Sequence, residues 1–171
     1  MSSIGDDFDR FDEPFNIAQV SPMATAESSA NPTDEDRTLR DAWLERLTQL
    51  VTSVRDWAEA ADWATRVIQK RMEDSRLGVY KAPALLLQKE TARVFLEPIA
   101  RSAPGTDGVV DLYLMPAYDD IARLCFENGE WRLHETSSGS AFANEEEDSK
   151  PLTKDSLGQA LERLMSDAGN R

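Results

Sequence analysis

The chain contains one cysteine, Cys125, and one histidine, His134, and both lie in the stretch LCFENGEWRLHE. A cysteine and a histidine within hydrogen-bond reach can form a nucleophilic pair, and with further ligands they can hold zinc. The stretch also contains Asn128-Gly129, a pair that strongly favours a two-residue β-hairpin turn. The chemistry open to Cys125 and His134 therefore depends on the register of a hairpin.

That register predicts two distinct faces. One face carries a set of apolar residues: Leu124, Phe126, Trp131 and Leu133. On the other face Cys125 lies opposite Arg132, His134 lies opposite Arg123, and the thiol and the imidazole are diagonal neighbours. A nucleophile also needs an oxyanion hole, and backbone N–H groups in the middle of a strand are already hydrogen-bonded. We therefore expect no catalytic pair here, and no zinc site, because structural zinc takes four cysteine or histidine ligands.

The polar face of the hairpin extends onto the preceding strand. A short turn at residues 116–118 places Asp111 opposite Arg123 and Tyr113 opposite Ile121. The candidate ligand face therefore consists of five residues: Asp111, Tyr113, Arg123, Arg132 and His134. Two arginines and a histidine on one face can bind a small anion. A small-anion-binding or enzymatic domain is therefore one functional hypothesis, and ion pairing of these residues with nearby acids is its structural alternative.

Sequence motifs for other chemistry are missing. The chain has no Walker A loop, no dinucleotide-binding glycine motif, no H-E-x-x-H and no nucleophile elbow. The acids between Asp107 and Asp120 suggest a magnesium site of the nuclease type, but such a site needs a following acid-x-Lys strand, and residues 90–149 contain no lysine. We therefore expect no cofactor, no bound metal and no enzymatic activity.

Charge and length narrow the classes of partner. The 171 residues include 32 acids and 19 bases, for a net charge of −13, which disfavours nucleic acid and anionic membranes and favours a basic protein partner. No apolar run approaches the roughly 18 residues that span a bilayer. The first residues lack the pattern of a signal peptide, and a single cysteine cannot form an internal disulfide. These features predict a cytoplasmic protein.

Composition divides the chain into four segments. Residues 1–33 carry six acids and one base and are rich in serine, alanine and proline, which predicts a disordered acidic tail. Residues 34–136 form an α+β domain. Residues 137–150 form a flexible acidic linker, and residues 151–171 contain a C-terminal amphipathic helix with Thr153 as its cap.

A helix is predicted after Thr33, with acidic residues in its first turn. Apolar residues recur at steps of three and four from Leu39 to Met72, which predicts one helix over residues 34–76 or two shorter helices. Gly78 can end this region in the left-handed conformation. The stripe contains a heptad-like seam that packs either on the chain's own sheet or, as a homodimer, on a second copy: Trp43, Leu50, Trp57 and Ala64.

Strands are predicted at 79–88, 91–100 and 109–115, followed by the hairpin. The fold class is therefore α+β, with one long N-terminal helix (or two helices) packed on one face of a four- or five-stranded antiparallel meander, and with a tethered C-terminal helix. In outline this arrangement resembles small acidic bacterial secretion chaperones. The helix that those proteins have between their third and fourth strands is missing, and no residue motif is shared.

These observations favour a non-enzymatic interaction protein: an adaptor, chaperone or inhibitor-like module that binds a protein partner. Two sets of apolar residues at helical spacing are candidate contacts. The acidic tail supplies Phe8, Phe11 and Phe15, and the C-terminal helix supplies Leu157, Leu161, Leu164 and Met165.

Overall fold

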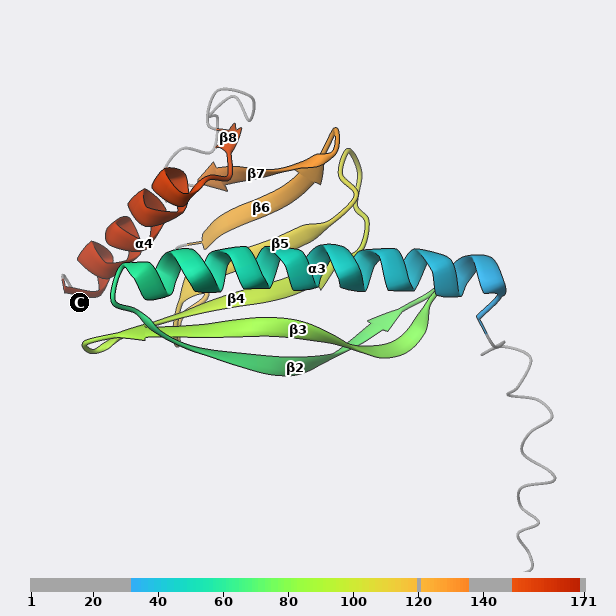
Figure 1. The fold of residues 1–171 in the computed structure, drawn as a ribbon, viewed down its shortest axis with the longest axis horizontal. Helices are drawn as coiled ribbons and strands as arrows, with labels where there is room; N and C mark the ends of the chain where they lie inside the picture. Colours follow the sequence, from blue (N-terminus) through green and yellow to red (C-terminus); the bar gives the residue numbers. More distant parts are fainter. Residues whose placement is uncertain (1–31, 120, 136–148, 170–171) are drawn as a thin grey trace, which may run out of the picture.

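The computed structural model describes residues 32–119, 121–135 and 149–169, which form one antiparallel sheet with two helices on one of its faces (Figure 1). The sheet has seven strands in the order of the chain, and each strand pairs with the next. The elements are α3 (Asp34–Ala60), β2 (Ala64–Asp74), β3 (Gly78–Lys89), β4 (Ala92–Ala100), β5 (Val109–Leu114), β6 (Ile121–Glu127), β7 (Glu130–Glu135), β8 (Ser149–Pro151) and α4 (Lys154–Gly169). The α+β class is thus confirmed, and the predicted count of four or five strands is corrected to seven.

The start of α3 is the predicted one. Thr33 Oγ1 accepts a hydrogen bond from the Asp36 N–H at 3.1 Å, and the Asp36 carboxylate accepts one from the Thr33 N–H at 3.0 Å. This capping box satisfies two N–H groups at the helix terminus. The N–H of Thr33 and the guanidinium of Arg76 lower the pKa of Asp36 to about 2. Arg76 donates to Asp36 at 2.5 Å and so connects the helix start to the turn between β2 and β3.

The predicted end of the helix was wrong. The helix stops at Ala60, Asp62 adopts a φ of 69°, and β2 follows over residues that were expected to be helical. The apolar residues Ala64, Ile68 and Met72 recur every four positions, and a step of four returns to the same side of a strand as well as of a helix. The pattern could therefore not distinguish the two structures. Gly78 does have a positive φ of 79°, but it begins β3 rather than ending a helix.

The Asn128-Gly129 hairpin has the predicted register. Both residues have positive φ, 50° and 83°, as a type I′ turn requires. Phe126 pairs with Trp131, and their rings make an edge-on contact with centroids 5.2 Å apart. Asp111 pairs with Arg123, as expected from the turn before β6. The sorting of side chains onto two faces in this part of the sheet is thereby confirmed.

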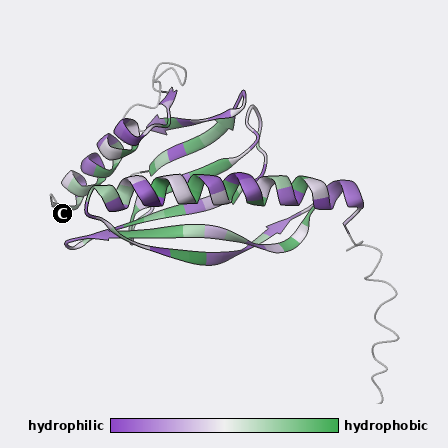
Figure 2. Cartoon of the chain, in the orientation of Figure 1, coloured by the Kyte–Doolittle hydropathy of each residue, from purple (hydrophilic) through white to green (hydrophobic). Residues whose placement is uncertain are grey.

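Both helices pack on the same face of the sheet and share one hydrophobic core. α3 contacts β2, β3 and α4, and α4 contacts β4 and β5. Trp43 is buried at the centre, where its indole donates to the Tyr80 hydroxyl at 3.0 Å. Bands of apolar and polar residues alternate along α3 (Figure 2), as expected for a helix with one buried side. The heptad-like seam of α3 therefore packs on the chain's own sheet, where Trp43 and Leu50 are buried and Trp57 is partly buried.

The C-terminal helix packs within the chain. Ser156 N–H donates to Thr153 Oγ1 at 3.1 Å, and Thr153 N–H donates to Ser156 Oγ at 2.8 Å, which confirms Thr153 as the cap. Leu157, Leu161 and Leu164 lie in the same core as the side chains of α3. The strand β8 occupies the end of the segment predicted as a linker, and residues 137–148 of that segment lie outside the described residues.

Candidate functional site

The face of the sheet opposite the two helices carries the predicted ligand face. Asp111 is fully buried, and its carboxylate accepts two hydrogen bonds from Arg123, from Nε at 2.7 Å and from Nη2 at 2.9 Å. The Tyr118 hydroxyl donates a third hydrogen bond to the same carboxylate. The hydrogen bonds to Asp111 raise the pKa of Arg123 further above its already high ordinary value. This buried carboxylate is therefore permanently paired with a cation that is itself half-exposed.

Tyr113 extends this network toward β4 and β2. Its hydroxyl donates a hydrogen bond to Glu97 Oε1 at 3.1 Å. The other carboxylate oxygen, Glu97 Oε2, forms an ion pair with Lys70 Nζ at 2.9 Å. Burial raises the pKa of Tyr113 to about 12, and the negative charge of Glu97 acts in the same direction. Burial likewise raises the pKa of Tyr118, whose hydrogen bond to the Asp111 carboxylate adds to the effect. Sequence reasoning did not identify Tyr118, because it lies in the turn before β6 and not in the alternating pattern of a strand.

Each cation of the predicted anion site already faces an oxygen acceptor. Arg123 is held by Asp111 as described. Arg132 donates to Ser149 Oγ at 2.7 Å and to Glu130 at 3.0 Å, and His134 Nε2 lies 3.2 Å from Glu127 Oε1. An incoming anion would compete with these carboxylates. The geometry therefore favours the alternative in which the face is stabilised by internal ion pairs.

The thiol and the imidazole are diagonal neighbours on the hairpin, as predicted, and the carboxylate of Glu127 lies beside them. Ligand atoms of Cys125, Glu127 and His134 all lie within 4.8 Å of one another. Burial raises the pKa of the Cys125 thiol, and the negative charge of Glu127 adds to the effect. A nucleophilic cysteine needs a lowered pKa, so this environment is the reverse of an activated thiolate. Glu127 is the residue that sequence reasoning missed, although its position two residues after Cys125 places it on the same face.

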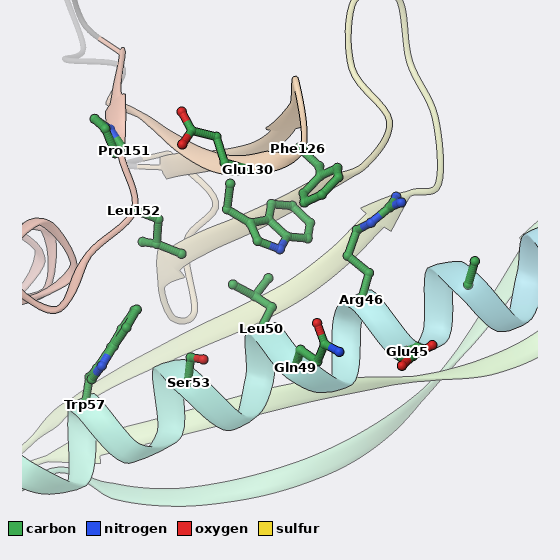
Figure 3. Close-up of a pocket in the computed structure, with 13 residues that line it drawn as sticks. Glu45, Arg46, Gln49, Leu50, Ser53, Trp57, Phe126, Glu130, Pro151 and Leu152 are labelled. Atoms are coloured by element: carbon green, nitrogen blue, oxygen red, sulfur yellow. The ribbon is translucent and has the colours of Figure 1, made fainter.

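A second candidate site is the hollow between α3, the tip of the β6–β7 hairpin and the segment after β8, which we name the α3 groove. Its volume is about 590 Å³. Trp57, Leu50 and Arg46 point from α3 into this space, and Phe126, Glu130 and Leu152 lie across from them (Figure 3). The ring of Trp131 also lines the groove and packs against Trp43 of the core, with centroids 6.4 Å apart.

The walls of the α3 groove are partly apolar, and internal contacts hold one of its ends. The guanidinium of Arg46 lies 4.0 Å above the Phe126 ring and donates to the Asp107 carbonyl at 2.9 Å. These two contacts hold the Arg46 guanidinium at one end of the groove, where its positive charge interacts with groups of the chain itself. Glu45 and Glu130 are exposed at its rim. The groove thus combines aromatic walls with an acidic edge.

A smaller hollow of about 360 Å³ lies beside the α3 groove, between the end of α3 and α4. Trp57 lines both hollows. Met165 lines the smaller hollow and is partly buried against the core, while the three leucines of its stripe are buried. The apolar stripe of α4 therefore packs in the core of the chain itself and leaves little apolar surface for a partner. Phe8, Phe11 and Phe15 lie outside the described residues.

Comparison with known proteins adds no family. No family model matches the chain, and no curated protein and no solved structure is significantly similar to it. Neither of the two described helices combines the length and the apolar character needed to cross a membrane. Functional inference therefore rests on the geometry of the two sites.

Proposed function

We propose that the chain is a non-enzymatic, acidic interaction protein, an adaptor, chaperone or inhibitor-like module, that binds a basic amphipathic segment of a protein partner in the α3 groove. The observation that carries this proposal is the open groove with aromatic walls and two carboxylates at its rim. Aromatic side chains on a rigid support are the groups that supply most of the affinity at protein interfaces.

The shape of the groove suits a few large apolar side chains. Trp57 and Trp131 are only partly buried although they adjoin the hydrophobic core. A leucine or an aromatic side chain placed between them would remove more apolar surface from water at about 25 cal/mol per Å². An amphipathic helix presents such side chains at steps of three and four residues. This groove replaces the C-terminal stripe as the proposed contact surface, because that stripe already fills the chain's own core.

Charge supports a basic partner. Glu45 and Glu130 flank the groove, and both arginines beside them are engaged within the chain: Arg46 with Phe126 and the Asp107 carbonyl, and Arg132 with Ser149 and Glu130. The whole chain carries a net charge of −13, which steers cationic segments toward it and raises the association rate at low ionic strength. Lysine or arginine residues beside the apolar side chains of the partner would lie near the two rim carboxylates.

The proposal is tested with a labelled helical peptide that carries leucine and tryptophan on one side and lysine on the other. Fluorescence anisotropy measures its binding to the full chain, and a second peptide carries glutamate in place of each lysine. We expect the lysine peptide to bind at least about tenfold more tightly, a difference of about 1.4 kcal/mol, and to weaken with added salt.

A pair of neighbouring variants locates the binding site. Ser53 lines the groove, whereas Thr52 is exposed on α3 and does not line it. Ser53→Trp should fill the groove and weaken binding at least about tenfold, and Thr52→Trp should leave the affinity unchanged. Equal binding of the two peptides, no binding of either, or equal effects of the two variants would contradict the proposal.

A further inference from the structure

The β6–β7 hairpin gathers the chain's only thiol, its only imidazole and one carboxylate at one point on the face of the sheet opposite the two helices. Cys125 and Glu127 are two residues apart on β6 and therefore share a face, and His134 on β7 lies diagonally across from Cys125. Ligand atoms of the three side chains lie within 4.8 Å of one another, and His134 Nε2 is 3.2 Å from Glu127 Oε1. We propose that Cys125, Glu127 and His134 together bind one divalent transition metal ion, with Zn²⁺ as the ion that fits best.

The donor set fits zinc chemically. A thiolate sulfur, an imidazole nitrogen and a carboxylate oxygen are the three kinds of protein ligand that Zn²⁺ takes, whereas Mg²⁺ and Ca²⁺ require oxygen ligands alone. Zinc–ligand bonds of about 2.0–2.3 Å in a tetrahedron place the ligand atoms about 3.3–3.8 Å apart. The 3.2 Å separation of the histidine nitrogen and the glutamate oxygen lies just below this range, and the sulfur, within 4.8 Å of the other ligand atoms, needs a shift of at most about 1 Å to reach it.

Three protein ligands leave one coordination position for water, which is the arrangement of an open zinc site. The expectation of no zinc site assumed a closed structural site with four cysteine or histidine ligands, and it did not count Glu127. The side chains of Glu127 and His134 are 27% and 23% exposed, so an ion can enter from solvent. Cys125 is only 9% exposed, and it closes the inner side of the site.

The surroundings of the three ligands admit a cation. The guanidinium groups of Arg123 and Arg132 hydrogen-bond to Asp111 and to Ser149 and Glu130, and the two carboxylates offset their positive charge beside the site. Glu127 also lines a polar hollow of about 370 Å³ that contains Thr106 and Asp107, from which solvent reaches the ligand carboxylate. Metal binding displaces the thiol proton to solvent, so affinity rises with pH.

Cobalt titration of the full, reduced protein tests this site. Co²⁺ substitutes for Zn²⁺ and gives a thiolate-to-metal charge-transfer band, and Cys125 is the only cysteine in the chain, so such a band can come from no other residue. We expect one equivalent of Co²⁺ to produce the band together with the visible absorption of a tetrahedral site, and one equivalent of Zn²⁺ to abolish both.

Four single variants assign the ligands. Cys125→Ser should abolish the band, and His134→Gln and Glu127→Gln should each lower the affinity for Zn²⁺ by more than the roughly 10–100-fold that loss of an outer-shell partner costs. Glu162→Gln is the matched control, because Glu162 is exposed on α4, on the other side of the sheet from the three ligands, and the substitution removes the same charge. It should leave the affinity for Zn²⁺ within a few-fold of the wild type.

A second measurement on the unaltered chain does not depend on how the variants fold. Iodoacetamide alkylates Cys125, and one equivalent of Zn²⁺ should slow this reaction at least about tenfold, because the metal-bound thiolate is shielded. Absence of the charge-transfer band in wild-type protein, unchanged alkylation in the presence of Zn²⁺, or equal losses of affinity in Glu127→Gln and Glu162→Gln would overturn the site.

Discussion

The ion pair between Asp111 and Arg123 has one fully buried and one half-exposed member, and this difference predicts how its two halves respond to mutation. The Asp111 side chain is 0% exposed and the Arg123 side chain is 47% exposed. Removal of Arg123 leaves a buried carboxylate without its main partner. Removal of the Asp111 charge leaves a guanidinium that can turn toward water.

The cost of Arg123→Met is set by the fate of the carboxylate. A buried carboxylate without a cation escapes most of its desolvation penalty by taking up a proton. For an ordinary aspartate, which titrates near pH 3.9 when unfolded, this uptake costs about 1.4 kcal/mol per pH unit above that value. The variant should therefore lose up to about 4 kcal/mol of unfolding free energy at pH 7 and only about 1.5 kcal/mol at pH 5.

The sign of the pH dependence follows from the proton uptake. Between pH 4 and pH 7 the folded variant binds one more proton than its unfolded state, so its stability falls as the pH rises. In Asp111→Asn the carboxylate is replaced by an amide, which does not take up a proton, so this source of pH dependence is absent. We expect this variant to cost about 1–3 kcal/mol, from the imperfect pairing of the amide with Arg123 and Tyr118, at both pH values.

Urea unfolding followed by tryptophan fluorescence measures these differences at pH 5 and pH 7, each relative to the wild type. Arg93→Met is the matched control, since Arg93 is an exposed arginine on the same sheet face, and it should change stability by no more than about 0.5 kcal/mol. A loss in Arg123→Met that is the same at both pH values, or that equals the loss in Arg93→Met, would refute the reasoning.

Two further predictions concern the tyrosines and two glycines. Burial raises the pKa of all three tyrosines of the chain, Tyr80, Tyr113 and Tyr118. The stability linked to their neutral form is therefore fully present below about pH 10 and is lost as the pH rises through the pKa values of the folded state. Ultraviolet absorbance should show phenolate appearing only above about pH 10 and together with unfolding. Half-ionised tyrosine in folded protein at about pH 10 would contradict this. A Cβ at Gly108 would lie 2.6 Å from the Trp43 ring, whereas one at Gly158 in α4 would meet nothing within 4 Å. Gly108→Ala should therefore cost about 1–3 kcal/mol and Gly158→Ala should add about 0.5–1 kcal/mol in urea unfolding, and equal effects would argue against the packing described.

The sequence determined the local features that depend on neighbouring residues. Thr33 and Thr153 cap helices because their hydroxyl groups reach N–H groups three residues later. Asn128-Gly129 sets the hairpin because these residues tolerate positive φ, and the two-residue turn then fixes which side chains share a face. The pairing of Asp111 with Arg123 followed from the same alternation across β5 and β6.

Tertiary structure decided the features that depend on distant contacts. Apolar residues recur every four positions along β2, a spacing that suits both a helix and a strand. Pairing of β2 with β3 along its whole length selected the strand. The apolar stripe of α4 was equally compatible with binding a partner or with packing on its own domain, and its contacts with α3, β4 and β5 selected the latter. The α3 groove and the cluster of Cys125, Glu127 and His134 arise from side-chain positions across separate elements, which spacing along one strand does not specify.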